Sequence, residues 1–286
     1  MNEQTINWYP GHMTKTKRQM EKILPLIDIV AEIIDARIPV SSRNPDLTGI
    51  IKNKKRIILL NKCDIANAES TKAWMKHFSD GGDLALNVDC RSGTGLTAFL
   101  PVVKNALHDK TEANAKRGMT GKTLRVMVVG IPNTGKSTFI NKMAGKTKAK
   151  TENRPGVTRG NQWFLIEKGV ELLDTPGILW HKFDDPKTGE VLAFTGAIKD
   201  SVMDIEELAL RFLDTVKTDY FDMLAARYKL SQSNVNMTAY ELLNQIGKNR
   251  GMKISGGETD TLRTAQMLFE EFRNAKIGRI TLEKVK

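Results

Sequence analysis

The chain contains a glycine-rich stretch at residues 130–137, Gly-Ile-Pro-Asn-Thr-Gly-Lys-Ser, whose residue types and spacing suit the binding of phosphate groups. Gly130 and Gly135 allow backbone torsions and close approaches that a Cβ would block, so successive backbone N–H groups can point at phosphate oxygens. Lys136 would place a compact positive charge on the β- and γ-phosphates, and the Ser137 hydroxyl suits Mg²⁺. We therefore expect a phosphate-binding loop. The alternative is an ordinary glycine turn.

The sequence on either side of this loop favours the phosphate-binding interpretation. Residues 124–129 are apolar, as in a short buried strand, and residues 137–143 form a plausible helix. A helix that starts directly after such a loop directs its N-terminus at the phosphates.

A second motif, Asn-Lys-Cys-Asp at residues 61–64, could identify the base of the same ligand. The carboxylate of Asp64 can accept hydrogen bonds from the N1–H and the exocyclic amino group of guanine, and adenine lacks both donors. Asn61 would brace the base pocket, and the aliphatic stem of Lys62 would cover one face of the ring. The motif follows an apolar stretch at 56–60, so we expect it at a strand's C-terminal end, where open α/β sheets bind ligands. Alone it could be a solvated turn, but together the two motifs predict a guanine nucleotide site.

The order of the two motifs is reversed relative to an ordinary GTPase, in which the phosphate loop comes first. We therefore predict an α/β fold with a circularly permuted P-loop GTPase domain, built on a mainly parallel sheet with helices on both faces. Asp-Thr-Pro-Gly at 174–177 follows an apolar stretch and places Asp174 toward the Mg²⁺ shell and the N–H of Gly177 toward the γ-phosphate. Thr158, in a polar and basic stretch at 153–160, is the candidate for a second hydroxyl on Mg²⁺, unless that stretch is only a turn.

The remaining expectations for the site concern its edges. Residues 89–92 occupy the place of a second guanine-contacting loop, although they match the common pattern poorly. Asn133 either braces the phosphate loop or helps to hold K⁺ beside the phosphates, as in potassium-stimulated GTPases. We expect Mg²⁺ to be held by Ser137, Thr158 and Asp174, and we expect Lys136 and Gly177 to act in catalysis. The expected GTP-binding residues are Asn61, Lys62, Asp64, Cys90, Asn133, Thr134, Gly135, Lys136, Ser137, Thr138, Thr158 and Gly177.

The chain of 286 residues is long enough for two domains. We expect the GTPase domain at 1–184, with a polar linker near 108–122 that joins the native ends of the permuted domain, and a small all-α domain at 185–286. A capping box from Thr238 to Glu241 precedes one helix. Two further helices have apolar stripes at 3.6-residue spacing: Ile205, Leu208, Ala209, Phe212, Leu213 and Val216 in one, and Leu262, Ala265, Phe269 and Phe272 in the other.

The formal net charge of +11 and a pI near 9.5 point to a polyanionic partner. The helical part could touch a phosphate backbone, or its charges could simply be solvated: they are Lys248, Arg250, Lys253, Arg263, Arg273, Lys276, Arg279 and Lys284. The two cysteines are too few for a zinc ribbon, and we expect them to be reduced thiols. Without a membrane span or signal peptide in the sequence, we expect a cytoplasmic monomer.

The motif order, the opening Trp-Tyr-Pro-Gly-His-Met at 8–13, the phosphate loop with Asn133, and Asp-Thr-Pro-Gly-Ile-Leu-Trp at 174–180 closely resemble the bacterial ribosome biogenesis GTPase A family, also called YlqF or RbgA. The resemblance covers nearly the whole chain. It implies GTP hydrolysis coupled to late maturation of the large ribosomal subunit, with ribosomal RNA on the basic surfaces. The related RsgA type of the small subunit has an oligonucleotide-binding barrel and a zinc site, for which this chain lacks the N-terminal length and the cysteines.

Ile178 occupies the place where Ras-like proteins have the glutamine that orients the attacking water, so another group must supply this function. The resemblance implies that His12 swings toward the γ-phosphate with the help of the ribosome, and His181 is its rival. Two other classes of function remain as alternatives. One is a regulatory switch with a protein effector, and the other is a P-loop kinase or a GTPase directed at the small subunit or at tRNA.

Overall fold

The structure is a computed structural model that describes residues 12–51, 53–145, 162–180, 185–198 and 204–285. A six-stranded sheet forms its centre, with β1 (Ile29–Asp35), β2 (Lys55–Asn61), β3 (Leu84–Asn87), β4 (Leu124–Val129), β5 (Gln162–Glu167) and β6 (Val170–Asp174). The strand order is β3-β2-β1-β4-β6-β5, and only β5 runs antiparallel to its neighbour. The five parallel strands therefore end at one edge of the sheet, where the two sequence motifs meet.

Strand β1 shows how the sequence positions the two helical layers, because all of its residues are buried. Odd-numbered residues such as Ile33 pack in the core that contains α4 (Phe99–Ala106) and α6 (Lys136–Ala144). Even-numbered residues face the other side, where Val30 packs with α1 (His12–Ile23) and α2 (Pro45–Ile51), and Ile34 with α3 (Ala68–Asp80). Alternate residues of a strand point to opposite faces, so a continuous apolar run indicates a sheet that is covered on both sides.

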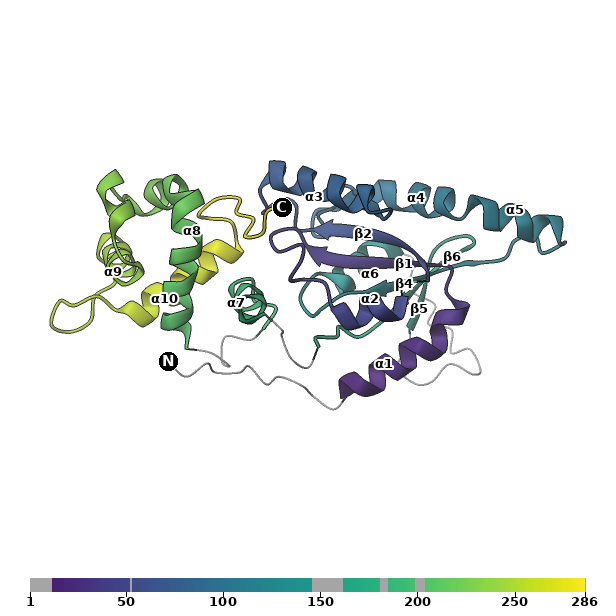
Figure 1. Ribbon diagram of the computed structural model, residues 1–286, viewed down its shortest axis with the longest axis horizontal. Coiled ribbons are helices and arrows are strands. Elements are labelled where there is room, and N and C mark those ends of the chain that lie inside the picture. The colour runs from purple at the N-terminus through teal and green to yellow at the C-terminus, as the bar shows by residue number, and fades with distance from the viewer. Residues whose placement is uncertain (1–11, 52, 146–161, 181–184, 199–203, 286) are drawn as a thin grey trace.

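The segment expected as a linker, 108–122, is helical over its first half, α5 (His108–Lys116). This helix buries none of its side chains and lies at the far end of the sheet from the helical part of the chain (Figure 1). Turn residues with Gly118 and Gly121 at positive φ then lead into β4.

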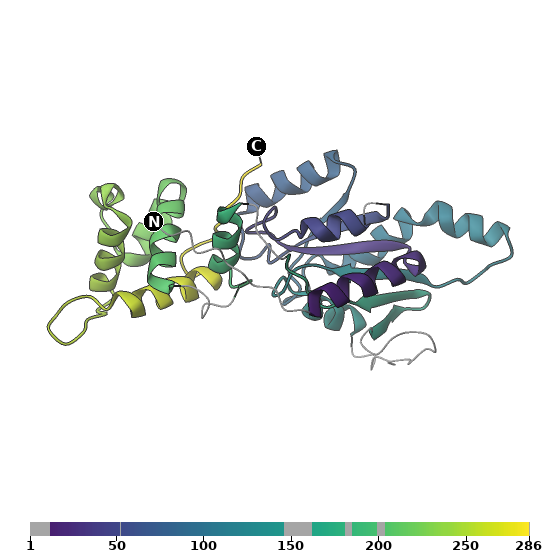
Figure 2. The same ribbon diagram turned by 60° about the horizontal axis from the view of Figure 1, so that its bottom comes forward.

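From residue 185 to residue 273 the described chain is mainly helical, with α7 (Pro186–Phe194), α8 (Ile205–Tyr228), a 3₁₀ turn η4 (Gln232–Asn236), α9 (Ala239–Asn249) and α10 (Thr261–Arg273). These helices lie together at one end of the sheet in both views (Figures 1 and 2). Phe194, Phe212, Phe269 and Phe272 form their aromatic core, with ring centroids 4.7–6.0 Å apart. Both expected stripes are on helices and the expected capping box is present.

One position of the expected stripes was wrong. Leu262 is 47% exposed, whereas Ala265, Phe269 and Phe272 are buried. Leu262 lies in the first turn of α10, where its side chain stays outside the core.

After α10 the chain turns back and lies against the sheet part of the molecule. Residues 277–285 form the C-terminal tail, which ends beside α3 (Figure 1). The indole N–H of Trp74 on α3 donates to the carbonyl of Glu283 at 2.9 Å, and the backbone N–H of Asn67 donates to the Thr281 hydroxyl at 3.0 Å. Among the described residues, no helix is both long and apolar enough to cross a membrane.

Candidate nucleotide site

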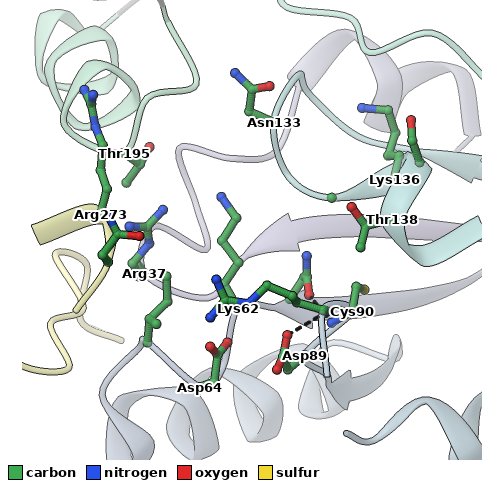
Figure 3. Close-up of a pocket in the computed structure, with 16 residues that line it drawn as sticks. Arg37, Lys62, Asp64, Asp89, Cys90, Asn133, Lys136, Thr138, Thr195 and Arg273 are labelled. Atoms are coloured by element: carbon green, nitrogen blue, oxygen red, sulfur yellow. Dashed lines mark hydrogen bonds between the residues drawn. The ribbon is translucent and has the colours of Figure 1, made fainter. Parts of the chain in front are cut away.

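A cavity of about 510 Å³ opens at the edge of the sheet where the parallel strands end (Figure 3). The loop after β2, the loop after β3 and the glycine-rich loop after β4 line it, and the helical part contributes a further wall. The structure therefore brings the two sequence motifs, seventy positions apart, to opposite sides of one cavity. In Figure 3, Lys136 and Thr138 lie on one side and Asp64 lies below the tip of Lys62.

The glycine-rich loop has the close contacts that its glycines predict. A Cβ on Gly130 would lie 2.4 Å from the carbonyl oxygen of Ile33, and one on Gly135 would lie 2.2 Å from the amide nitrogen of Asn61. Both glycines have positive φ, as does Asn133 at 63°. The loop leads directly into α6, whose first residue is Lys136. Its backbone N–H groups and the helix N-terminus thus form a site suited to phosphate.

The side chains of the loop point in different directions. Ser137 and Thr138 are exposed and line the cavity. Thr134 is buried, and its hydroxyl donates to the carbonyl of Ile131 at 3.0 Å, so only its backbone is available to a ligand.

Lys136 is buried and its ammonium group donates to the carbonyl of Ile131 at 2.7 Å. Burial lowers the pKa of Lys136 to about 8, although the charge of Asp174 opposes this shift. Burial likewise raises the pKa of Asp174, and the charge of Lys136 opposes this rise. Each group is therefore poorly solvated in the nucleotide-free protein, so a phosphate and a cation would satisfy both.

Gly177 lies against the glycine-rich loop, although it does not line the cavity itself. A Cβ at this position would be 2.8 Å from the Lys136 ammonium and 2.9 Å from the backbone nitrogen of Pro132. The structure thus brings Asp174 and Gly177 close to Lys136 and the glycine-rich loop.

Asn61 connects the loops on the two sides of the cavity. Its side-chain amide donates to the carbonyl of Thr134 at 2.6 Å, and its side-chain oxygen accepts from the backbone N–H of Cys90 at 2.9 Å. Both cysteines are free thiols, and Cys90 is buried in the wall of the cavity. Asp64 also lines the cavity and makes no hydrogen bond or ion pair with a described residue, so its carboxylate is available to a ligand.

Two residues at the end of β1 belong to this site and were missed in the sequence. Asp35 is buried and accepts from the ammonium group of Lys62 at 2.8 Å and from the guanidinium group of Arg37 at 2.9 and 2.7 Å. Burial raises the pKa of Asp35, but Arg37 and Lys62 outweigh this effect and hold it well below its usual range. Charged residues directly after a buried strand were the signal that could have identified them.

The helical part was also missed as a wall of the cavity, to which it contributes Thr195, Arg273 and Asn274. Arg273 donates to the carbonyls of Phe194 and Ala193 at 3.0 and 2.8 Å and thereby ties α10 to the end of α7. The side-chain amide of Asn133 donates to the carbonyl of Gly196 at 2.9 Å. The phosphate side of the cavity is therefore in direct contact with the helical part.

Three residues expected at the site cannot be placed. Thr158 and His181 lie outside the described residues, and so does the side chain of His12, which begins α1. The other two histidines, His77 and His108, are exposed.

A family model described as 50S ribosome-binding GTPase matches residues 125–244. The ribosome biogenesis GTPase A of Bacillus licheniformis is 45% identical over 279 residues, which cover 98% of each chain. The protein of the same name from Thermotoga maritima is 31% identical over 280 residues, 98% of this chain and 94% of that one. Among solved structures, GNP-bound YlqF from T. maritima is similar with a TM-score of 0.63 and 29% identity, covering 94% of this chain and 98% of that chain.

Proposed function

The chain belongs to the ribosome biogenesis GTPase A family and hydrolyses GTP, and we propose that it acts in late maturation of the large ribosomal subunit by binding ribosomal RNA. The observation that carries the nucleotide assignment is the cavity at the sheet edge, which has at one end a carboxylate that pairs with no described residue and at the other a glycine-rich loop. The names of the family model and the relatives support the ribosomal partner.

Within the cavity, each end has a distinct task. Asp64 pairs with the N1–H and amino group of guanine, and the stem of Lys62 covers the ring while its ammonium group is held by Asp35. Asn61 keeps the base side and the phosphate side at a fixed separation through its two hydrogen bonds. Lys136 and the backbone of the glycine-rich loop hold the phosphates.

The residues on the phosphate side fit Mg²⁺ that is held jointly with a nucleotide. No group of three or more His, Cys, Asp or Glu side chains among the described residues could hold a metal ion alone. Mg²⁺ instead uses one or two protein oxygens together with substrate phosphates. The Ser137 hydroxyl, the Asp174 carboxylate and, in the GTP-bound protein, Thr158 would supply the protein oxygens, and the ion would neutralise charge that develops during phosphoryl transfer.

Hydrolysis requires a group that orients water, and Ile178 does not provide it. Its side chain is 4% exposed and packs in the apolar core. We assign this task to His12. The expected result for His12→Ala is a large loss of subunit-stimulated turnover with nearly unchanged GTP affinity. An equal loss of both would make His12 a binding or structural residue, and a loss confined to a His181→Ala variant would transfer the task to that residue.

Asn133 is the proposed protein ligand for K⁺ beside the phosphates. In the structure its amide nitrogen is engaged with the carbonyl of Gly196, so its side-chain oxygen is the atom left for a cation. Positive charge beside the β- and γ-phosphates would stabilise the transition state. Turnover that is faster in K⁺ than in Na⁺, and a loss of that difference in Asn133→Ala, would support this role. Equal turnover in the two salts would leave Asn133 as a brace of the loop.

We propose residues 185–286 as the RNA-binding domain, because several of its cations form no ion pair with a residue that the structure describes. Arg250, Lys276 and Lys284 form ion pairs with carboxylates. Among the exposed cations that make no ion pair with a described residue are Lys248, Lys253, Arg263 and Arg279. Such cations are available to RNA phosphates.

Salt dependence tests this assignment. The variant in which Lys248, Lys253, Arg263 and Arg279 are replaced by Gln should bind large subunits more weakly and with a smaller salt dependence. The slope of log K against log[salt] should fall by about one for each phosphate contact that is lost. Replacing the exposed Lys72 and Lys76 of α3 by Gln is the matched control. An unchanged slope in the fourfold variant would remove this face from RNA binding.

A further inference from the structure

The segment between β1 and α2, residues 36–44, which we term the connector, is buried to a degree unusual for a loop. Of its nine residues only Val40 is exposed and only Arg43 is intermediate, although the segment contains two arginines, two serines and an asparagine. Buried polar groups require partners, so the connector's shape must be defined by specific hydrogen bonds. These bonds lead to both the phosphate side of the cavity and the helical part.

Hydrogen bonds within the connector give it a fixed shape. The hydroxyl of Ser42 accepts from the backbone N–H of Asp35 at 3.0 Å and donates to the carbonyl of Ile38 at 2.7 Å. The guanidinium and the backbone N–H of Arg37 both donate to the Asp35 carboxylate. A displacement at one end of such a segment is passed to the other end because the bonds in between resist bending.

The C-terminal end of the connector holds the loop that contains Gly177. Asn44 is buried, and its side-chain amide donates to the carbonyl of Ile178 at 2.9 Å. Its side-chain oxygen accepts from the backbone N–H of Asp46 at 2.9 Å and so caps α2. Asn44 is thus anchored on α2 and fixes the peptide group between Ile178 and Leu179, one residue beyond Gly177.

The middle of the connector is held by the tail that follows α10. The carboxylate of Glu283 accepts from the backbone N–H groups of Val40 and Ser41, at 2.6 and 3.0 Å, and the N–H of Leu282 donates to the carbonyl of Arg37 at 2.8 Å. The guanidinium carbon of Arg37 lies 5.3 Å from the ring centroid of Phe272 on α10. These contacts involve different atoms of the connector and come from α10 and the tail that follows it.

We propose that the connector transmits the position of the helical part to the Gly177 loop, with Asn44 as a positioning residue for GTP hydrolysis and Glu283 as the residue that fixes the connector to the helical part. The inference rests on the proposed γ-phosphate contact of Gly177 but is independent of the ribosomal partner. A partner that moves the helical part would pull on Glu283, shift the connector and change the position of the Ile178 peptide. Regulation of hydrolysis then requires no contact between that partner and the nucleotide.

The first test is Asn44→Asp, which keeps the cap of α2 but places an acceptor opposite the carbonyl of Ile178. We expect basal turnover at saturating GTP to fall about tenfold, which corresponds to about 1.4 kcal/mol, while GDP affinity stays within about twofold. Unchanged turnover would mean that Asn44 only caps α2, and the proposal would be wrong. Equal losses of turnover and GDP affinity would mean general damage and would equally refute it.

The second test is a double-mutant cycle between the two ends of the connector. Glu283→Ala should lower basal turnover, and Glu283→Gln, which retains an acceptor oxygen, should lower it less. Combining Asn44→Asp with Glu283→Ala should lower turnover no further than the stronger single variant, because both interrupt one path. Glu69→Ala on α3, an exposed carboxylate whose ion pair among the described residues is with Lys72, is the control and should behave as the unmodified protein. Fully additive effects would separate the two residues and overturn the proposal.

Both tests use the full chain without ribosomes, so their outcome is distinguishable from that of the ribosomal assignment. The melting temperature and GDP affinity of each variant show whether that variant folds. If Glu283→Ala does not fold, Glu283→Gln takes its place in the cycle. If the variants change turnover as expected but large subunits do not stimulate the protein, the connector proposal stands and the proposed ribosomal partner is wrong.

Discussion

Replacing Asp64 by asparagine should change the base that the protein prefers. The Asp64 carboxylate lines the cavity without a hydrogen bond or ion pair to a described residue, so the nucleotide is its expected partner. Guanine presents two donors to it, N1–H and the amino group, whereas asparagine offers one acceptor oxygen and one amino group. One charge-assisted hydrogen bond is thus lost, and the asparagine amino group instead faces the guanine amino group, so that two donors oppose each other. A hydrogen bond to a charged group is worth about 1.5–3 kcal/mol. We therefore expect GTP and GDP affinity to fall by about 10- to 150-fold.

Xanthine provides the complementary test of the same substitution. It retains N1–H but has a carbonyl in place of the amino group, so the asparagine amide matches it with one acceptor and one donor. Competition of GDP and XDP against a fluorescent nucleotide, with hydrolysis of GTP and XTP, measures the change. Asp80→Asn on α3, an exposed carboxylate paired with Lys76, is the charge-matched control. A GDP to XDP affinity ratio that does not change in Asp64→Asn would contradict the reasoning and remove Asp64 from the base site.

Three further predictions follow from close contacts and burial. Gly177→Ala should lower turnover about tenfold or more because its Cβ would lie 2.9 Å from the backbone nitrogen of Pro132, whereas Gly49→Ala, with nothing within 4 Å, should leave turnover unchanged; equal turnover of the two variants would contradict this contact. Phosphate raises the pKa of Lys136 from its value of about 8 in the free protein, so binding takes up a proton above that pH, and GDP affinity measured by calorimetry should fall as pH rises from 8 to 9.5. A flat profile would place Lys136 away from the phosphates. Gly247→Ala on α9 should lower the melting temperature, since its Cβ would lie 2.2 Å from the Thr259 methyl group, at a cost of about 1–3 kcal/mol; an unchanged melting temperature would show that α9 can move away.

The sheet and the two sides of the cavity could be predicted because their signals are local. Apolar runs of strand length precede both motifs, and the carboxyl ends of parallel strands meet at one edge. The reversed motif order and the resemblance to ribosome biogenesis GTPase A then defined the permuted fold, which the strand order and the relatives confirm. The capping box at Thr238 is a further local signal, since both of its partners lie within one helical turn.

The contacts between the sheet part and the helical part could not be predicted in the same way. The distance between Asn44 and Ile178 is 134 positions in the chain, and that between Ser41 and Glu283 is 242. No periodicity relates such residues, and an asparagine or a glutamate in a polar stretch is equally consistent with solvent. Arg37 illustrates the difficulty, because it is buried and its guanidinium group lies over the ring of Phe272 on α10, a contact that only the fold defines. The role of the helical part as a wall of the cavity was missed for this reason.

The most direct test of the proposed function is GTP hydrolysis by the purified protein with and without large ribosomal subunits, in K⁺, with small subunits as the control. The account predicts turnover that increases with large subunits and not with small subunits, and that the increase is lost in His12→Ala. Turnover that is equally low in all three conditions, from protein that binds GDP normally, would contradict it.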